Sequence, residues 1–292
     1  MQKEKTTDWH QMTGELDFNM TNDFLFRALL QENNHVLAAL SASMMGWDEA
    51  EVTSAKIENP IELRGAFDSK EFILDVKVCL NTSMTVNLEM QVINRGNWPE
   101  RSLAYMCRSF DNLNRGDDYK EIRPVYQIGI TDFSPIKESH RFFSRYMFQE
   151  VEDHNIYSDK IGMFVLDLTA IERADENDRR YKRNLWAEMF KAESWEDLKM
   201  LAQENPAIDE AVGQVYKITR DEMLRQRMEA REEYNRIERT NQRILEELKA
   251  QVTGLKTKVT DLEAKNSDLE TENTEIKAEL AKYKAQEHPT TP

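Results

Sequence analysis

The 292-residue chain contains only 2 cysteines, 9 glycines and 7 prolines. Collagen, low-complexity disorder and disulfide-stapled scaffolds are therefore excluded, because each needs a much larger share of one of these residues. No segment approaches the roughly 18 consecutive apolar residues that cross a bilayer, and the polar start of the chain lacks the apolar core of a signal peptide. We expect a cytoplasmic protein, in a reducing compartment and without a membrane partner.

The chain also lacks an excess of basic residues. It has 39 Lys+Arg against 54 Asp+Glu, a formal net charge of −15. Such a chain binds a polyanion only through a local basic surface or through metal ions. The five histidines show no pair at metal-ligand spacing, and neither a glycine-rich phosphate loop nor a nucleophile elbow is present. NTPase and serine-hydrolase functions are thus unsupported.

The composition changes near residue 215. Beyond it the chain has one glycine, no proline before Pro289 and no tryptophan, which is typical of a long helix. We therefore predict five segments: an N-terminal tail (1–18), a globular domain (19–215), a charged connecting helix (216–243), a parallel coiled coil (244–284) and a disordered tail (285–292).

An unbroken heptad repeat supports the coiled coil. The a and d positions are Leu245, Leu248, Val252, Leu255, Val259, Leu262, Asn266, Leu269, Asn273, Ile276, Leu280 and Tyr283. A 3.5-residue period kept this long imposes a left-handed supercoil, and asparagine at a positions favours a parallel, in-register dimer. In that dimer Lys258 would face Glu263 of the other chain, which is attractive. We predict a homodimer, while a trimer stays open.

Seven arginines occur in the stretch 217–243, interleaved with six acidic residues. Two interpretations follow. A basic helix ahead of a coiled coil can contact phosphates, whereas interleaved charges at i,i+4 spacing are typical of a solvated helix. We favour the solvated helix.

The globular part alternates between helical and strand patterns. Helices are predicted over 19–45, with Thr21 or Asn22 as the N-cap, over 98–114 and over 181–203. A β-hairpin is predicted over 72–93 with a turn at 81–83, and buried strands over 124–130 and 161–168. This order predicts an α/β sandwich of helices around a mixed sheet.

The hairpin carries the residues most able to do chemistry. Strand alternation puts Asp75 and Lys77 on the same face as Glu89 and Gln91, opposite the apolar face. Two carboxylates and an amide within a buried sheet suit Mg²⁺ or Mn²⁺. A metal held there can activate a water molecule and polarise a phosphoryl oxygen.

Several segments together resemble the PD-(D/E)XK nuclease superfamily, and more closely the bacterial family of recombination-promoting nucleases and transposases. They are Thr21–Phe26, Ile73–Lys77, Val86–Gln91, Arg101–Tyr105 and Val125–Ile130 with Phe133, within residues 17 to 205. The resemblance implies a restriction-endonuclease-like mixed sheet flanked by helices, and a metal-dependent endonuclease acting on DNA.

The resemblance also implies roles for individual residues. Asp75 and Glu89 would be metal ligands, and Gln91 would stand where the superfamily has a lysine. Lys77, on the neighbouring strand, is a candidate for the missing positive charge. Asp23 or Glu32 on the first helix would be an additional acidic ligand. Arg101 and Tyr105 match the family pattern and would contact the phosphate or support the site.

Three functions remain open. The first is an Mg²⁺-dependent DNA endonuclease, linked to recombination or mobile elements and dimerised by its coiled coil. The second is an inactive nuclease fold that serves as a DNA-binding or protein-interaction module. The third is a coiled-coil assembly protein whose globular part binds another protein. Metal-dependent cleavage lost on mutation of Asp75 or Glu89 would single out the first.

Overall fold

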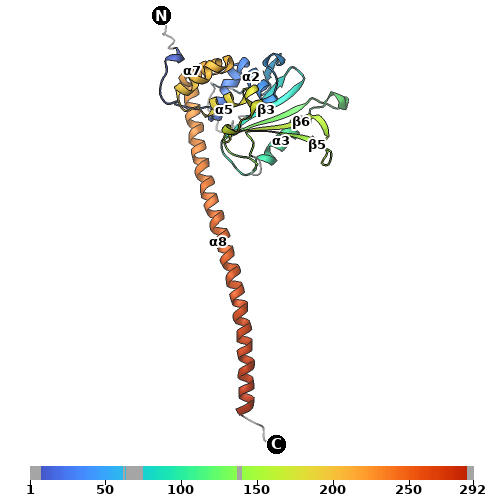
Figure 1. Ribbon diagram of the computed structural model, residues 1–292, viewed down its shortest axis with the longest axis vertical. Coiled ribbons are helices and arrows are strands. Elements are labelled where there is room, and N and C mark those ends of the chain that lie inside the picture. Colours follow the sequence, from blue (N-terminus) through green and yellow to red (C-terminus); the bar gives the residue numbers. More distant parts are fainter. Residues whose placement is uncertain (1–7, 62, 64–74, 137–139, 288–292) are drawn as a thin grey trace. The chain divides into compact units, whose positions relative to one another are not determined.

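The computed structural model describes residues 8–61, 63, 75–136 and 140–287. Its centre is a six-stranded sheet in the order β1-β2-β3-β4-β6-β5, in which β3, β4 and β6 are parallel and the other neighbours antiparallel (Figure 1). The strands are β1 (Ala55–Ile57), β2 (Val76–Leu80), β3 (Met84–Gln91), β4 (Val125–Thr131), β5 (Phe143–Gln149) and β6 (Ile156–Asp167). The predicted mixed sheet is confirmed.

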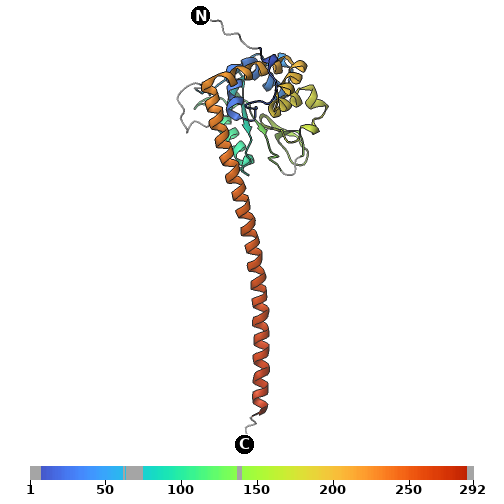
Figure 2. The same cartoon turned by 90° about the vertical axis from the view of Figure 1, so that its left-hand side faces the viewer.

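Eight α-helices accompany the sheet in the described residues. They are α1 (Asp23–Glu32), α2 (Asn34–Met45), α3 (Trp98–Phe110), α4 (Glu176–Arg180), α5 (Arg183–Lys191), α6 (Trp195–Glu204), α7 (Pro206–Arg220) and α8 (Glu222–Glu287). Of the two predicted caps of the first helix, Asn22 is the one used, and its side chain accepts from the Leu25 amide at 3.3 Å. Helices α1 and α2 pack against α7 (Figure 2).

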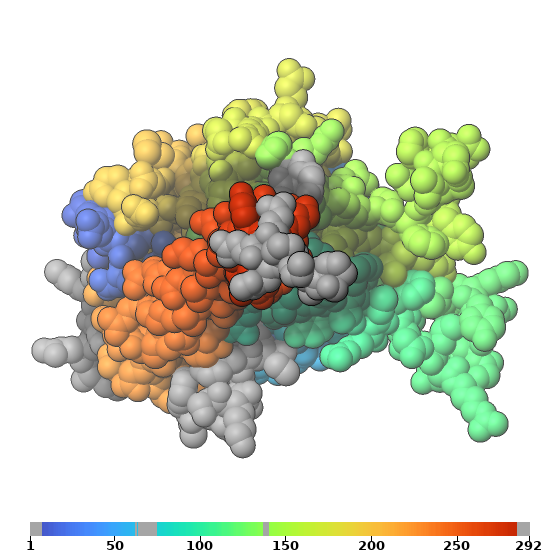
Figure 3. All heavy atoms as spheres, turned by 90° about the horizontal axis from the view of Figure 1, so that it is seen from below, coloured from blue at the N-terminus to red at the C-terminus, as the bar shows by residue number. Residues whose placement is uncertain are grey.

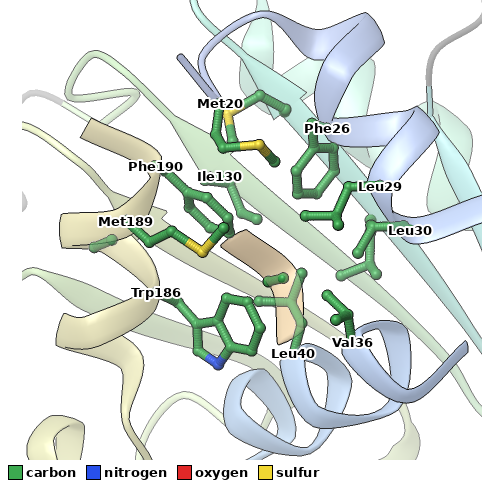
Figure 4. Close-up of a cluster of buried hydrophobic side chains, with 14 of the residues drawn as sticks. Met20, Phe26, Leu29, Leu30, Val36, Leu40, Ile130, Trp186, Met189 and Phe190 are labelled. Atoms are coloured by element: carbon green, nitrogen blue, oxygen red, sulfur yellow. The ribbon is translucent and has the colours of Figure 1, made fainter. Parts of the chain in front are cut away.

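One face of the sheet holds the main apolar core. Apolar side chains of β2, β3, β4 and β6 pack there against α1, α2, α5 and α7. Figure 4 shows the centre of this core, where Phe26 of α1 and Phe190 of α5 meet edge to face with ring centroids 5.7 Å apart beside Ile130 of β4. The predicted alternation of the hairpin is therefore confirmed for the strands that the structure describes, while residues 72–74 lie outside them.

Helix α3 covers part of the opposite face. Its Trp98 and Met106 pack on Met163 and Val165 of β6. A Cβ atom on Gly129 of β4 would lie only 2.3 Å from Cζ2 of Trp98, so a glycine lets the helix approach this closely. The polar residues of β3 face this side and are buried there.

The chain divides into two compact units, residues 1–236 and 237–292. The first turns of α8 belong to the first unit, because Leu224 and Met228 are buried and the Met228 carbonyl accepts a hydrogen bond from the Asn22 side chain at 3.0 Å. The expected solvated helix over 217–243 is therefore wrong for the part before residue 237. In the second unit the a and d leucines are exposed, and pairing into a coiled coil stays a prediction.

Several elements differ from the sequence expectations. Strands β1 and β5 and helices α4 and α7 were not predicted, and the helix expected over 181–203 is divided into α5 and α6 by a capping box of Ser194 and Asp197. In the space-filling view, the segments coloured for residues near 115 and near 150 project from the same side (Figure 3). None of the sequence-predicted site residues belongs to these segments. No helix among the described residues is long and apolar enough to cross a membrane.

Candidate active site

The hairpin brings Asp75 and Glu89 to the same level of the sheet. Val76 pairs with Leu88 across the β2–β3 ladder, so Asp75, one residue before β2, comes opposite Glu89. The backbone carbonyl of Asp75 accepts hydrogen bonds from the Asn59 amide group, at 3.0 Å, and from the fully buried Arg27 of α1. These hydrogen bonds hold the backbone of Asp75 in place and so position its side chain.

A cavity of about 130 Å³ lies at the end of β3 on the side of α3. Its polar lining comes from α1, the start of β2, β3 and the turn after it, α3, and the first turns of α8. The polar and charged lining residues are Asp23, Asp75, Glu89, Gln91, Arg95, Arg101, Arg231, Tyr234 and Asn235. The structure thus brings five of the sequence-predicted residues to one cavity: Asp23, Asp75, Glu89, Gln91 and Arg101.

Glu89 is the most enclosed of the carboxylates. Its side chain is 5% exposed, and Oε1 forms an ion pair with Nη2 of Arg101 at 2.6 Å. Burial raises the pKa of Glu89 above its ordinary value; Arg101 opposes this shift, and the negative charges of Asp75 and Asp23 add to it. A second cation beside Glu89 would favour the ionised form, because it would offset both the burial and the neighbouring acids.

Asp23 is already paired. It is the first residue of α1, and its carboxylate takes two hydrogen bonds from Arg231 of α8, with Nε to Oδ1 at 2.6 Å and a second bond from Nη2 to Oδ2. Both groups are largely buried. The predicted metal ligand Asp23 therefore lies at the cavity, but both of its oxygens are engaged by an arginine.

Three buried oxygen atoms of the cavity residues have no hydrogen-bond partner within the described part of the chain: Oε2 of Glu89, Oε1 of Gln91 and Oδ1 of Asn235. The amide group of Gln91 donates to the Ile93 carbonyl at 3.0 Å, which leaves its oxygen unpaired. Buried acceptors without partners are costly and call for a donor or a cation. The cavity has room for about four water molecules at roughly 30 Å³ each.

Other predicted residues lie farther away. Lys77 does not line the cavity, and its Nζ pairs with Glu58 at 3.1 Å. Glu32 accepts from Gln214 at 3.0 Å and does not line the cavity either. Tyr105 lies beneath Arg101, whose guanidinium carbon is 5.3 Å from the ring centroid, so the tyrosine supports the arginine.

The residues of α8 were not predicted as site residues. Leu224, Met228, Arg231 and Asn235 follow one another at intervals of 4, 3 and 4, which places them on one helix face. That spacing was visible in the sequence, but the interleaved charges favoured a solvated helix. Its two apolar members, now buried, were the available signal that this face is packed.

The donor set suits a hard divalent cation. Among the described residues, no three His, Cys, Asp or Glu side chains lie close enough to form a metal site by themselves. Mg²⁺ is, however, commonly held by one or two carboxylates with waters and neutral oxygens completing its shell. Asp75 and Glu89 with the amide oxygens of this cavity fit that pattern, and the unpaired oxygens are the observation that supports it.

A comparison with known families agrees with this geometry. The family model described as PD-(D/E)XK nuclease family transposase matches residues 20–241. No curated protein and no solved structure matches the chain at a significant level. The matched range contains all six strands and every residue of the cavity. The chain therefore belongs to the PD-(D/E)XK nuclease family transposases.

Proposed function

We propose that this protein is a metal-dependent DNA endonuclease that hydrolyses phosphodiester bonds at the cavity beside β3. A nuclease or transposase-like function is given by the family. The observation that carries the finer proposal is that Asp75, Glu89 and Gln91 line one buried cavity, in which two of them have unpaired oxygens. Plasmid cleavage by variants of these residues tests it.

Asp75 and Glu89 would hold the metal, Mg²⁺ or Mn²⁺. When bound, such an ion supplies Lewis acidity, which polarises a phosphoryl oxygen and makes a bound water more acidic. The Gln91 side chain does not ionise, so it cannot act as a general acid or base. Its role would be to orient a water through its amide. The lysine that would act electrostatically at this position is absent, and Lys77 is held by Glu58 outside the cavity.

Two arginines would bind the DNA backbone. Arg95 and Arg101 both line the cavity. An acidic chain needs such a local basic surface to accept a polyanion. Arg101 is about one-third exposed, so it can hold Glu89 with one part of its planar group and offer the other donors to a phosphate. Tyr105 would keep the guanidinium in that orientation.

We further propose that the protein acts as a homodimer through residues 244–284. Between Leu245 and Tyr283 the apolar a and d side chains are each at least 44% exposed in the single chain. An apolar stripe of this length is seldom left in water. In a dimer, two active sites would be present in one molecule, so that each could cut one strand of the DNA.

If the protein is a coiled-coil dimer, negative charge introduced at d positions should dissociate it. The double variant Leu255→Asp with Leu262→Asp should be monomeric, because four carboxylates would be buried in the dimer seam. The matched control, Thr257→Asp with Ala264→Asp, adds the same charge at outward-facing f positions and should stay dimeric. Light scattering coupled to gel filtration gives the mass. A monomeric wild type would contradict the coiled coil, and a mass three times that of the chain would identify a trimer.

A further inference from the structure

We propose that Asn235 of α8 is a further residue of the metal site, and that its amide oxygen would contact the cation held by Asp75 and Glu89, directly or through one water. This inference rests on the proposed function, since it concerns the same metal. It adds a segment of α8, far from the hairpin in sequence, to the metal site. Asn235 lies within the family-matched range but outside the hairpin and the first helix.

The burial and the missing partner of Asn235 carry the inference. The residue is 4% exposed, lines the same cavity as Glu89 and Gln91, and its Oδ1 accepts no hydrogen bond from any described residue. An asparagine buried for packing alone would leave an acceptor without a hydrogen bond, which destabilises the fold. An apolar residue would fill that position at lower cost.

All three unpaired cavity atoms are acceptors, namely one oxygen each of Glu89, Gln91 and Asn235. Two of the arginines that line the cavity are engaged by carboxylates, since Arg101 forms an ion pair with Glu89 and Arg231 donates to Asp23. Oxygen atoms without donors, gathered at one cavity, match the preference of Mg²⁺ and Mn²⁺ for carboxylate, amide and water oxygens.

Helix α8 is held firmly where it carries Asn235. On successive turns the Met228 carbonyl accepts from Asn22, Arg231 pairs with Asp23, and the Tyr234 hydroxyl accepts from Arg95 at 2.8 Å. A ligand or water-orienting group is effective when its own backbone is fixed in this way, because little conformational freedom is lost on binding. The contacts that Asn22 and Asp23 make with α8 thus hold Asn235 at the cavity.

The test measures metal binding without DNA. Full-length protein, freed of metal with a chelator, is titrated with Mn²⁺, and free Mn²⁺ is followed by electron paramagnetic resonance. We expect Asn235→Ala to weaken Mn²⁺ binding about ten-fold, as for other groups that orient a metal shell. Asn235→Asp, which has the same shape, should bind Mn²⁺ more tightly than wild type. Asn241→Ala, the same substitution at an exposed position of α8, should bind as wild type.

The outcomes separate the inference from the proposed function when Glu89→Ala is measured beside them. Loss of binding in Glu89→Ala, with weaker binding in Asn235→Ala, supports both. Loss in Glu89→Ala with wild-type binding in both Asn235 variants overturns the role of Asn235 and leaves the proposed metal site standing. Wild-type binding in all variants removes the metal from this cavity, and the inference with it. If Asn235→Ala does not fold, the Asn235→Asp result decides.

Discussion

Replacing Glu89 by glutamine should reduce metal-dependent DNA cleavage by roughly a thousand-fold or more, which corresponds to about 4 kcal/mol of transition-state stabilisation. Glutamine keeps the shape of the side chain and can still contact Arg101, but it removes the charge that would hold the cation. Asp75→Asn should have a similar effect for the same reason. Both side chains line the cavity, and Asp75 adds to the electrostatic environment that raises the pKa of Glu89.

Supercoiled plasmid is the substrate for this test, incubated with Mg²⁺, Mn²⁺ or EDTA. The matched control is Glu204→Gln, the same change at an exposed residue at the end of α6, outside the cavity, which should cut as wild type. Full cleavage by Glu89→Gln would exclude the cavity as the site of hydrolysis. If folded wild-type protein cut no DNA with either metal, the inactive nuclease fold would be the better description. A gel-shift measurement would then distinguish DNA binding from protein binding.

The sheet side of the site was predictable from the sequence because strand alternation is a local property. Asp75, Glu89 and Gln91 occupy alternate positions of a hairpin whose other face is plainly apolar, so their common direction follows from the period of two. The turn at 81–83 and the Asn22 cap follow from residue types that favour those conformations. Each of these predictions depends on neighbours in the chain alone.

The contribution of α8 was not predicted because it depends on tertiary packing. Around Arg231 the sequence is rich in interleaved charges, a pattern that a solvated helix shares with a helix docked by a narrow face. Only the position of Asp23 at the start of α1 turns Arg231 into a buried partner. Strand β5 was missed for a related reason: it lies at the edge of the sheet and is partly exposed, so it has no continuous apolar run.

Breaking the Asp23–Arg231 pair should destabilise the first unit by about 3 kcal/mol, since removing one partner leaves the other charge buried and unpaired. Both side chains are at most 13% exposed, so solvent compensates little. We expect Arg231→Met and Asp23→Asn to be similarly destabilised, and the double variant to recover a substantial part of the loss. Arg225→Met, the same change at an arginine of α8 whose side chain is 39% exposed, should alter stability by less than about 0.5 kcal/mol.

Urea unfolding followed by tryptophan fluorescence isolates the relevant unit, because all five tryptophans lie before residue 237. The same variants decide what Asp23 does. If Asp23 is a metal ligand that Arg231 competes for, Arg231→Met should bind Mn²⁺ more tightly than wild type. If Asp23 anchors α8 instead, Arg231→Met should bind Mn²⁺ no more tightly, and the stability losses should be strongly coupled. We expect the second result, because both oxygens of Asp23 are already engaged and the anchored turn leads directly to Asn235.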